Sequence, residues 1–230
     1  MNLINEKHDA ISSAEKILTE AGYNICEFIS VIGRRNSSLF NINSDTYKNF
    51  SKLYEQLEQE DYTLCSKGKL LERLVFCLFE EGYKSLFTVK SNCRTNTNEI
   101  DIFLLWTEQA INSGLPEKYP FLGNSIICEC KNYEAPVSVT YVGKFASVLR
   151  SSNAKTGIMF AWEGITGKDN WKDAQGFIRK FALGEKIFIL IIDKNDLKRI
   201  YDRETNIFYI LYLKHEALKN DIDYEKYISC

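Results

Sequence analysis

The sequence predicts an α/β fold in which a mixed central sheet is flanked by helices and preceded by a helical N-terminal region. Three observations lead to this class. Apolar residues recur at helical spacing through the first sixty residues. From residue 66 onward, short apolar runs of strand length alternate with helical stretches. Residues 187–192 form an unbroken apolar run, which is typical of a strand buried on both faces.

The N-terminal region shows two helical segments. Ile11, Ile17 and Leu18 follow helical spacing, and this run ends at Gly22. A second helix is expected to begin at Ser44, a favourable cap residue, and to continue through the apolar positions up to Leu57. We therefore divide the chain into a helical region at 1–62, with a role in substrate, partner or dimer contacts, and an α/β domain at 63–230.

The α/β domain is expected to begin with a helix that has a broad apolar face and ends at Gly82. A polar insertion with two prolines, at 107–124, separates the second and third strands. The strands are expected at 85–90, 100–105, 125–131, 157–161, 187–192 and 207–213. The later helices are expected at 139–151 and 171–183, the latter closed by Gly184, with a further helical start after residue 193.

Composition restricts the function only loosely. The 230 residues are 45% hydrophobic and 26% charged, which is ordinary for a globular protein with a sizeable core. The net charge of −2 gives no overall attraction to nucleic acid, although a local basic groove remains compatible with it. No Gly-x-x-x-x-Gly-Lys-Ser/Thr loop is present, so the sequence gives no sign of an ATPase site.

Cysteine usage and hydropathy indicate a cytoplasmic protein without a membrane segment. The seven cysteines include no Cys-x-x-Cys pair, and the Cys128-x-Cys130 spacing is wrong for a zinc knuckle. With only His8 and His215 as histidines, we expect reduced, mostly buried thiols rather than structural zinc. No apolar run has the length of a signal or membrane-spanning segment.

Two neighbouring charges stand at the end of the apolar strand at 125–131. Side chains alternate between the faces of a strand, so Glu129 and Lys131 share one face while Cys128 and Cys130 share the other. Charged groups at the end of a buried strand are costly unless something stabilises them. A metal ion on the carboxylate, with the ammonium beside a water or phosphate, would do so.

A second acid precedes the neighbouring apolar strand. Asp101 begins the run at 100–105 and faces away from Ile100 and Ile102. If this strand lies beside the one with Glu129, two carboxylates meet at one point. Mg²⁺ prefers such oxygen ligands, completed by waters and substrate phosphate, and can generate a hydroxide for phosphodiester cleavage. Lys131 would add a fixed positive charge.

The acid followed by acid-x-Lys on the next strand resembles the PD-(D/E)xK restriction-endonuclease-like superfamily, and the closer likeness is to its Mrr-like branch. The likeness covers roughly residues 66–200, and the order of its four motifs makes it fairly specific. The first two motifs are Gly68-Lys69-Leu70-Leu71-Glu72-Arg73-Leu74-Val75, ending at Glu81-Gly82-Tyr83, and Glu99-Ile100-Asp101-Ile102. The other two are Cys128-Glu129-Cys130-Lys131-Asn132-Tyr133, then Pro136-Val137-Ser138, and Phe145-Ala146-Ser147-Val148-Leu149-Arg150, then Ala154-Lys155-Thr156-Gly157-Ile158.

The resemblance implies a restriction-endonuclease-like fold and a Mg²⁺- or Mn²⁺-dependent endonuclease that cuts DNA. Asp101 and Glu129 would bind the metal, Lys131 would position or activate water, and Glu72 would assist from the first helix. The resemblance further implies bacterial restriction or anti-phage defence, with a homodimer or a defence-system protein as partner. Two alternatives stay open: a catalytically silent nucleic-acid- or protein-binding subunit, and a nuclease acting on RNA.

Two departures from the family pattern affect the site. The family often has glycines just before the metal aspartate, where this chain has Thr97-Asn98-Glu99, which makes Glu99 a candidate extra ligand. The connection between Asp101 and Glu129 is also longer than the resemblance leads us to expect. Each site residue has a structural alternative as well: a surface ion pair for Glu129 and Lys131, a turn cap for Asp101, a solvated charge for Glu72.

Overall fold

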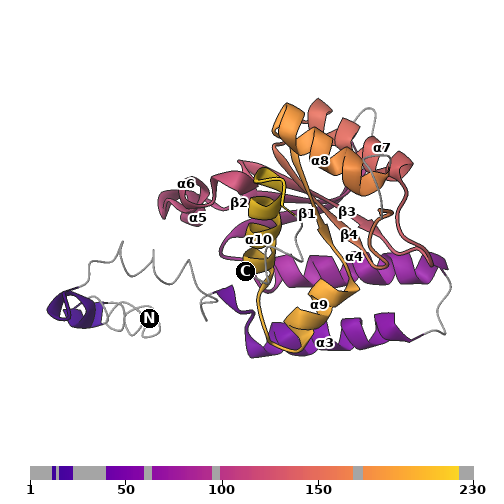
Figure 1. Cartoon of the computed structure of the whole chain (residues 1–230). Helices are drawn as coiled ribbons and strands as arrows, with labels where there is room; N and C mark the ends of the chain where they lie inside the picture. Colours follow the sequence, from indigo (N-terminus) through magenta and orange to yellow (C-terminus); the bar gives the residue numbers. More distant parts are fainter. Residues whose placement is uncertain are drawn as a thin grey trace. The chain divides into compact units, whose positions relative to one another are not determined.

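The computed structural model describes residues 12–13, 16–22, 40–59, 64–94, 99–167 and 173–222, and the chain divides into two compact units, Met1–Asn41 and Ile42–Cys230. In the first unit, residues 12–13 and 16–20 are helical, and a turn at Gly22 with a positive φ of 82° follows. All elements named below belong to the second unit (Figure 1).

The second unit alternates helices and strands as the sequence predicts. Its helices are α3 (Ser44–Glu58), α4 (Leu64–Glu80), α5 (Glu108–Asn112), α6 (Leu115–Lys118), the short 3-10 helix η2 (Pro120–Leu122), α7 (Val139–Ser151), α8 (Ala174–Glu185), α9 (Lys194–Tyr201) and α10 (Ile207–Lys219). Its strands are β1 (Phe87–Arg94), β2 (Glu99–Trp106), β3 (Ser125–Lys131), β4 (Thr156–Ala161) and β5 (Phe188–Ile192).

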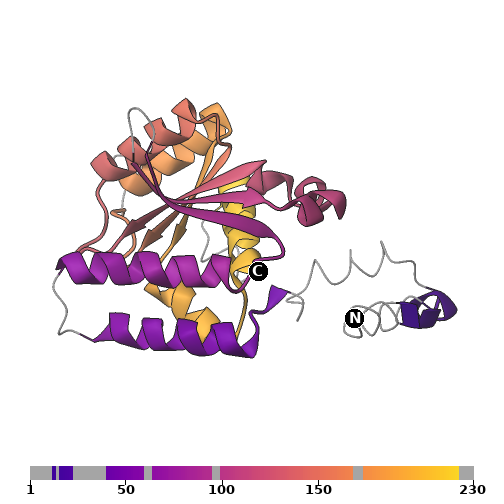
Figure 2. The ribbon, with the colours of Figure 1, turned by 180° about the vertical axis from the view of Figure 1, so that it is seen from behind.

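The five strands form one mixed sheet in the order β1-β2-β3-β4-β5. Strands β1, β2 and β3 pair antiparallel, while β3, β4 and β5 pair parallel. Parallel neighbours need crossover connections, and α7 and α8 provide them between β3 and β4 and between β4 and β5. The expected mixed α/β fold is therefore confirmed (Figure 2).

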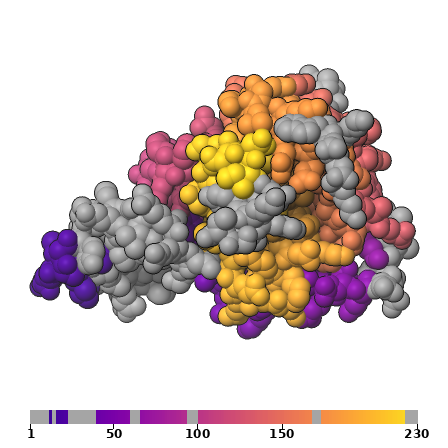
Figure 3. All heavy atoms as spheres, in the orientation of Figure 1, coloured from indigo at the N-terminus to yellow at the C-terminus, as the bar shows by residue number. Residues whose placement is uncertain are grey.

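Helices cover the two faces of this sheet. Helices α7 and α8 lie on one side, and α4 lies on the other with α3 packed beyond it (Figures 1 and 2). In Figure 3 the yellow surface of α10 lies between the surfaces of α8 and α9. Helices α7 and α8 pack on the sheet through one apolar cluster, which includes Ile127, Phe145, Leu149, Met159 and Ile178.

Gly157 lets α7 lie close to the sheet. A Cβ at this position would stand 2.7 Å from Cζ of Phe145 and 2.8 Å from both methyl carbons of Leu149. These distances leave no room for any larger residue in the described packing of α7 on β4.

Helix α3 packs against α4 and α9. Its cap is Asn43, whose side chain accepts hydrogen bonds from Asp45 and Thr46, so the expectation of a cap at Ser44 was wrong by one residue. Its buried face includes Tyr54, whose ring stacks on Tyr201 at 4.8 Å between centroids. The compact unit thus begins ahead of the boundary drawn at 62/63, and the separate role of 1–62 stays a prediction.

The segment 207–213 is a helix, and the expectation of a strand there was wrong. Its isoleucine, phenylalanine, tyrosine and leucine residues suit a strand by composition, but Asn206 caps a helix by accepting from the amide of Tyr209. Ile207, Ile210 and Leu211 are buried at helical spacing, and they cover part of β5.

Two smaller differences concern helix ends and the insertion. Helix α8 ends at Glu185 rather than before Gly184, and its C-cap Lys186 adopts the left-handed conformation at φ 56°. Trp171, the expected start of this helix, lies outside the described residues. The insertion at 107–124 folds into α5, α6 and η2, and Trp106 Nε1 holds it by donating to the carbonyl of Gly123 at 2.8 Å.

Two further expectations can be compared with the described residues. Cys77, Cys93, Cys128 and Cys130 carry free thiols, and three of them are buried. Among the helices described, none combines the length and the hydrophobicity that a bilayer-spanning segment requires.

Candidate active site

Asp101 lies near the start of β2, and its carboxylate reaches across to the next strand. Oδ2 of Asp101 accepts a hydrogen bond of 2.8 Å from the backbone amide of Cys130. The neighbouring Ile100 and Ile102 are buried, whereas Asp101 is half-buried. The carboxylate is thus fixed at the edge of the core, beside the backbone between Glu129 and Lys131.

The register of β2 and β3 brings the two predicted acids together. Ile102 pairs with Cys128 and Phe103 with Ile127 in an antiparallel ladder. Continuing this register by one residue places Asp101 across from Glu129. Residues directly opposite in an antiparallel pair share a face and lie about 4.5–5.5 Å apart at Cβ. The charge of Asp101 also acts on Glu129, in keeping with this extension of the register.

Lys131 lies on the same face of β3 as Glu129, two residues further along. Its Nζ is 2.5 Å from Oε1 of Glu129, and the two side chains are 21% and 19% exposed. An ion pair this close and this shielded holds the ammonium beside the two carboxylates.

Burial and mutual charge shift the pKa values of this group. Burial raises the pKa of Glu129, the charge of Asp101 raises it further, and Lys131 opposes both. Burial lowers the pKa of Lys131, but Glu129 and Asp101 outweigh this effect, so the net shift is upward. The surroundings of Glu129 therefore disfavour another negative charge and favour a cation.

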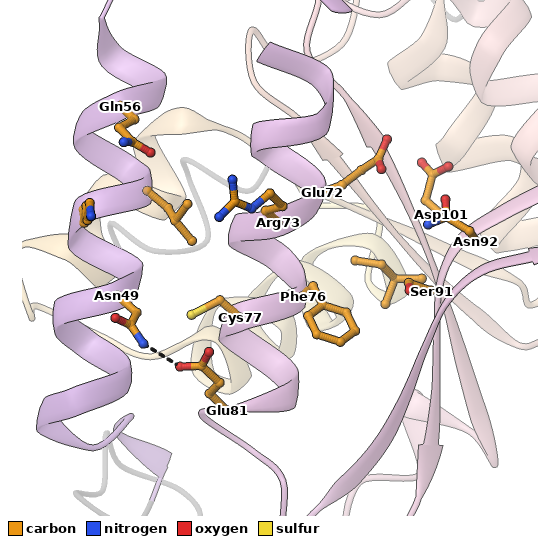
Figure 4. A pocket seen from close by; sticks show the side chains of 13 residues that line it. Asn49, Gln56, Glu72, Arg73, Phe76, Cys77, Glu81, Ser91, Asn92 and Asp101 are labelled. Carbon is orange, nitrogen blue, oxygen red and sulfur yellow. Dashed lines mark hydrogen bonds between the residues drawn. The ribbon is translucent and has the colours of Figure 1, made fainter. Parts of the chain in front are cut away.

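Glu72 lies on α4 and approaches the same carboxylates. It is half-buried, and its charge is one of those that raise the pKa of Glu129. In Figure 4, the carboxylates of Glu72 and Asp101 point toward one another from α4 and β2. Both residues line one pocket.

The structure adds one residue that the sequence analysis missed. Ser91 pairs with Ile102 and Cys93 with Ile100, so Asn92 of β1 lies across from Asp101 on its other side. Asn92 has a positive φ of 51°, which is rare inside a strand. An asparagine within a strand was the available signal, since asparagine tolerates this conformation better than most residues.

Glu99 is the remaining candidate ligand from the sequence. The side chain of Glu99 lies outside the described residues. Tyr133, two residues beyond Lys131, and Tyr141 are partly exposed and lie 5.4 Å apart between ring centroids. Among the described residues, no group of three or more His, Cys, Asp or Glu side chains is arranged to hold a metal.

Comparison with known proteins agrees with this geometry. No curated protein matches the chain. The family model described as "Restriction endonuclease" (Mrr_cat) matches residues 66–201, which is more than half of the 230 residues and runs from α4 through α9. Asp101, Glu129, Lys131 and Glu72 all lie within the matched segment. The chain therefore belongs to the restriction endonuclease family, and its α/β unit is a nuclease domain of that type.

Proposed function

We propose that this chain is an endonuclease that hydrolyses DNA phosphodiester bonds with Mg²⁺, or Mn²⁺ in its place. The observation that carries the proposal is the antiparallel register of β2 and β3, which, extended by one residue beyond the pair of Ile102 and Cys128, brings Asp101 opposite Glu129. The Lys131 ammonium lies 2.5 Å from Glu129. An arrangement of two acids and one lysine at the end of adjacent strands has no evident structural purpose, because apolar residues would stabilise the strand ends at less cost.

The donor set fits a hard divalent cation. Asp101 and Glu129 supply two carboxylates, which is the usual protein contribution to a Mg²⁺ site that keeps several waters and takes substrate phosphate as a further ligand. Burial and the charge of Asp101 raise the pKa of Glu129, and a bound cation would relieve the repulsion between the two acids. When bound, the ion would supply Lewis acidity toward the phosphate and lower the pKa of a water.

Lys131 and Glu72 have supporting roles in this proposal. The ammonium of Lys131 would orient the attacking water and stabilise the negative charge that develops on the phosphate. Its position 2.5 Å from Glu129 would keep it within reach of a phosphate bound to an ion that the two acids hold. Glu72 would add negative charge that favours the cation and would orient its waters from the side of α4.

The family also suggests a biological setting. We propose a role in bacterial restriction or anti-phage defence, in the cytoplasm, with a second copy of the chain or a defence-system protein as partner. Cutting both strands of a duplex needs two active sites or two binding events, which favours the homodimer. Residues 1–62 are the proposed region for such contacts.

The test is cleavage of plasmid, linear duplex and single-stranded DNA by the purified chain in Mg²⁺, Mn²⁺ or EDTA, with an RNA of the same sequence in parallel. Lys131→Ala is the matched variant. We expect cleavage of DNA in either metal, none in EDTA, and a turnover about 100-fold or more lower for Lys131→Ala.

The outcomes separate the alternatives. Cleavage of RNA alone would assign the chain to RNA substrates. Binding of DNA without cleavage under any condition would identify a silent binding subunit. Equal cleavage by the parent and Lys131→Ala, at equal folded fraction, would show that the activity arises elsewhere.

A further inference from the structure

A pocket of about 600 Å³ extends from the proposed active site to α3. Residues of α3, α4, β1 and β2 line it, and Figure 4 shows them around α4. They are Asn49, Lys52, Leu53, Gln56, Glu72, Arg73, Phe76, Cys77, Glu81, Ser91, Asn92, Asp101 and Ile102. The pocket thus joins α3, which precedes the segment matched by the family model, to the two acids at 72 and 101.

The negative and the positive side chains of this pocket lie on different sides of α4. Glu72 and Asp101 lie at the β2 side of α4, whereas Arg73 extends toward α3 in Figure 4. Lys52 of α3 lines the same pocket. Over the described ranges, Arg73 and Lys52 form no ion pair with a carboxylate, and both side chains are exposed.

The third acid of the pocket is already engaged. Oε2 of Glu81 accepts a hydrogen bond of 2.9 Å from Nδ2 of Asn49, and this bond ties α3 to the end of α4. Arg73 and Lys52 are therefore the two cations available to a ligand on the α3 side. Gln56 adds an amide there, and Phe76 adds an aromatic surface on the strand side of α4 (Figure 4).

We propose that Arg73 and Lys52 bind the phosphates of a nucleic acid strand next to the bond that is cut. The proposal deepens the proposed function and rests on it, because the carboxylates at the other end are taken to hold the ion that binds the scissile phosphate. A strand carries a charge at every nucleotide, so its phosphates meet the ion at one end of the pocket and the two cations at the other.

The chemistry of the pocket favours a strand over a small anion. A free phosphate or a mononucleotide would engage only one end of the pocket. A strand engages both ends, and it can place a sugar or base against Phe76 and an amide partner at Gln56. Phosphate contacts of this kind position the substrate and carry no sequence information.

The test measures binding without chemistry. A short fluorescein-labelled duplex, and a single strand of the same sequence, are titrated with the full chain in EDTA and in Ca²⁺ over a range of salt concentrations. For Arg73→Ala and for Lys52→Ala we expect weaker binding. For each phosphate that a variant no longer binds, the slope of log affinity against log salt should become shallower by about 0.9 for a duplex, or about 0.7 for a single strand.

The chain offers a matched control on the same helix. Lys48 lies one turn before Lys52, is 76% exposed and pairs with Asp45 instead of lining the pocket. Lys48→Ala should keep the affinity and the salt slope of the parent. Arg73→Lys, which keeps the charge, should recover most of the slope that Arg73→Ala removes, and this recovery excludes loss of fold as the cause.

The results distinguish this inference from the proposed function. If the parent cleaves DNA but Arg73→Ala and Lys52→Ala keep the parental salt slope, the inference is overturned and the nuclease stands. If the two variants have a shallower slope but no condition yields cleavage, the pocket binds nucleic acid and the proposed chemistry is wrong.

Discussion

The backbone amide of Cys130 donates a hydrogen bond to Oδ2 of Asp101 across the pairing of β2 and β3. Cys130 stands between Glu129 and Lys131 on β3, so this bond fixes Asp101 against the backbone that carries the other two charges. Asp101 also lines the pocket it shares with Glu72. The relative position of the acids therefore depends on strand pairing, which is rigid, and not on a loop.

Asp101→Asn separates the charge of this residue from its hydrogen bond. The amide oxygen can still accept from Cys130, so the free energy of unfolding should change little without metal. Under the proposed function one anionic ligand is removed, and Mn²⁺ affinity should fall by more than the roughly 100-fold that loss of a supporting group causes. Titration calorimetry with Mn²⁺ measures this, and unchanged affinity would remove Asp101 from the metal site.

Glu72→Gln tests whether Glu72 supports the site or belongs to its ligands. The charge of Glu72 acts on Glu129, so its removal should weaken Mn²⁺ binding by roughly tenfold, as for groups that only orient ligands. Cleavage at saturating metal should then recover much of the parental turnover. A loss of affinity as large as that in Asp101→Asn would make Glu72 a ligand, and no loss would make it a solvated charge.

Gly157→Ala should destabilise the fold by about 1–3 kcal/mol, because its Cβ would overlap Phe145 and Leu149. Gly143, within α7, is the matched control, since a Cβ there meets no atom within 4 Å. Gly143→Ala should raise the free energy of unfolding by about 0.5–1 kcal/mol through helix propensity. Denaturant unfolding measures both, and equal effects of the two substitutions would contradict the packing described for α7.

His215 should make stability depend on pH. Its ring lies 4.4 Å from Phe188 and 4.9 Å from Phe121, between centroids, and burial lowers its pKa against the opposing effect of Glu216. The unfolded chain therefore binds a proton more readily, so this contribution to stability is present above the unfolded pKa of about 6.5 and is lost as pH falls below it.

The measurement is the denaturation midpoint between neutral and mildly acidic pH. In His215→Gln the midpoint should fall less steeply as the pH is lowered than it does in the parent. His8→Gln, at the other histidine of the chain, is the control for titration of a different group. A decline of equal steepness in the parent and in His215→Gln would show that other groups cause it.

The sequence predicted those parts of the fold that depend on local pattern. Residues 187–192 and 125–131 were recognisable as strands because apolar runs of that length suit buried strands, and alternation placed Glu129 and Lys131 on one face. The segment 207–213 was misassigned because its composition favours a strand, while the side-chain cap at Asn206 and burial against β5 decide for a helix. The contact between this segment and β5 cannot be predicted from the local sequence pattern.

The pocket could not be predicted from the sequence for a similar reason. Arg73 and Lys52 belong to different helices, and nothing in their local sequence shows that α3 lies beside α4. Glu72 was found only through the family resemblance, because a glutamate on an otherwise apolar helix is usually solvated. Asn92 came from the register of β1 and β2, which pattern alone does not fix.

The packing of α3 and α10 has a consequence for how this domain can be inherited. Both helices lie outside the segment 66–201 that the family model matches, yet Phe50 and Tyr54 of α3 and Ile207 and Ile210 of α10 are buried. A recombination event that moved the matched segment alone into another gene would uncover the surfaces of α4 and β5 that these helices cover, and we expect such a product to aggregate. Exchange of this nuclease between proteins therefore requires breakpoints ahead of α3 and beyond α10, and the helices that flank the family segment are transmitted with it.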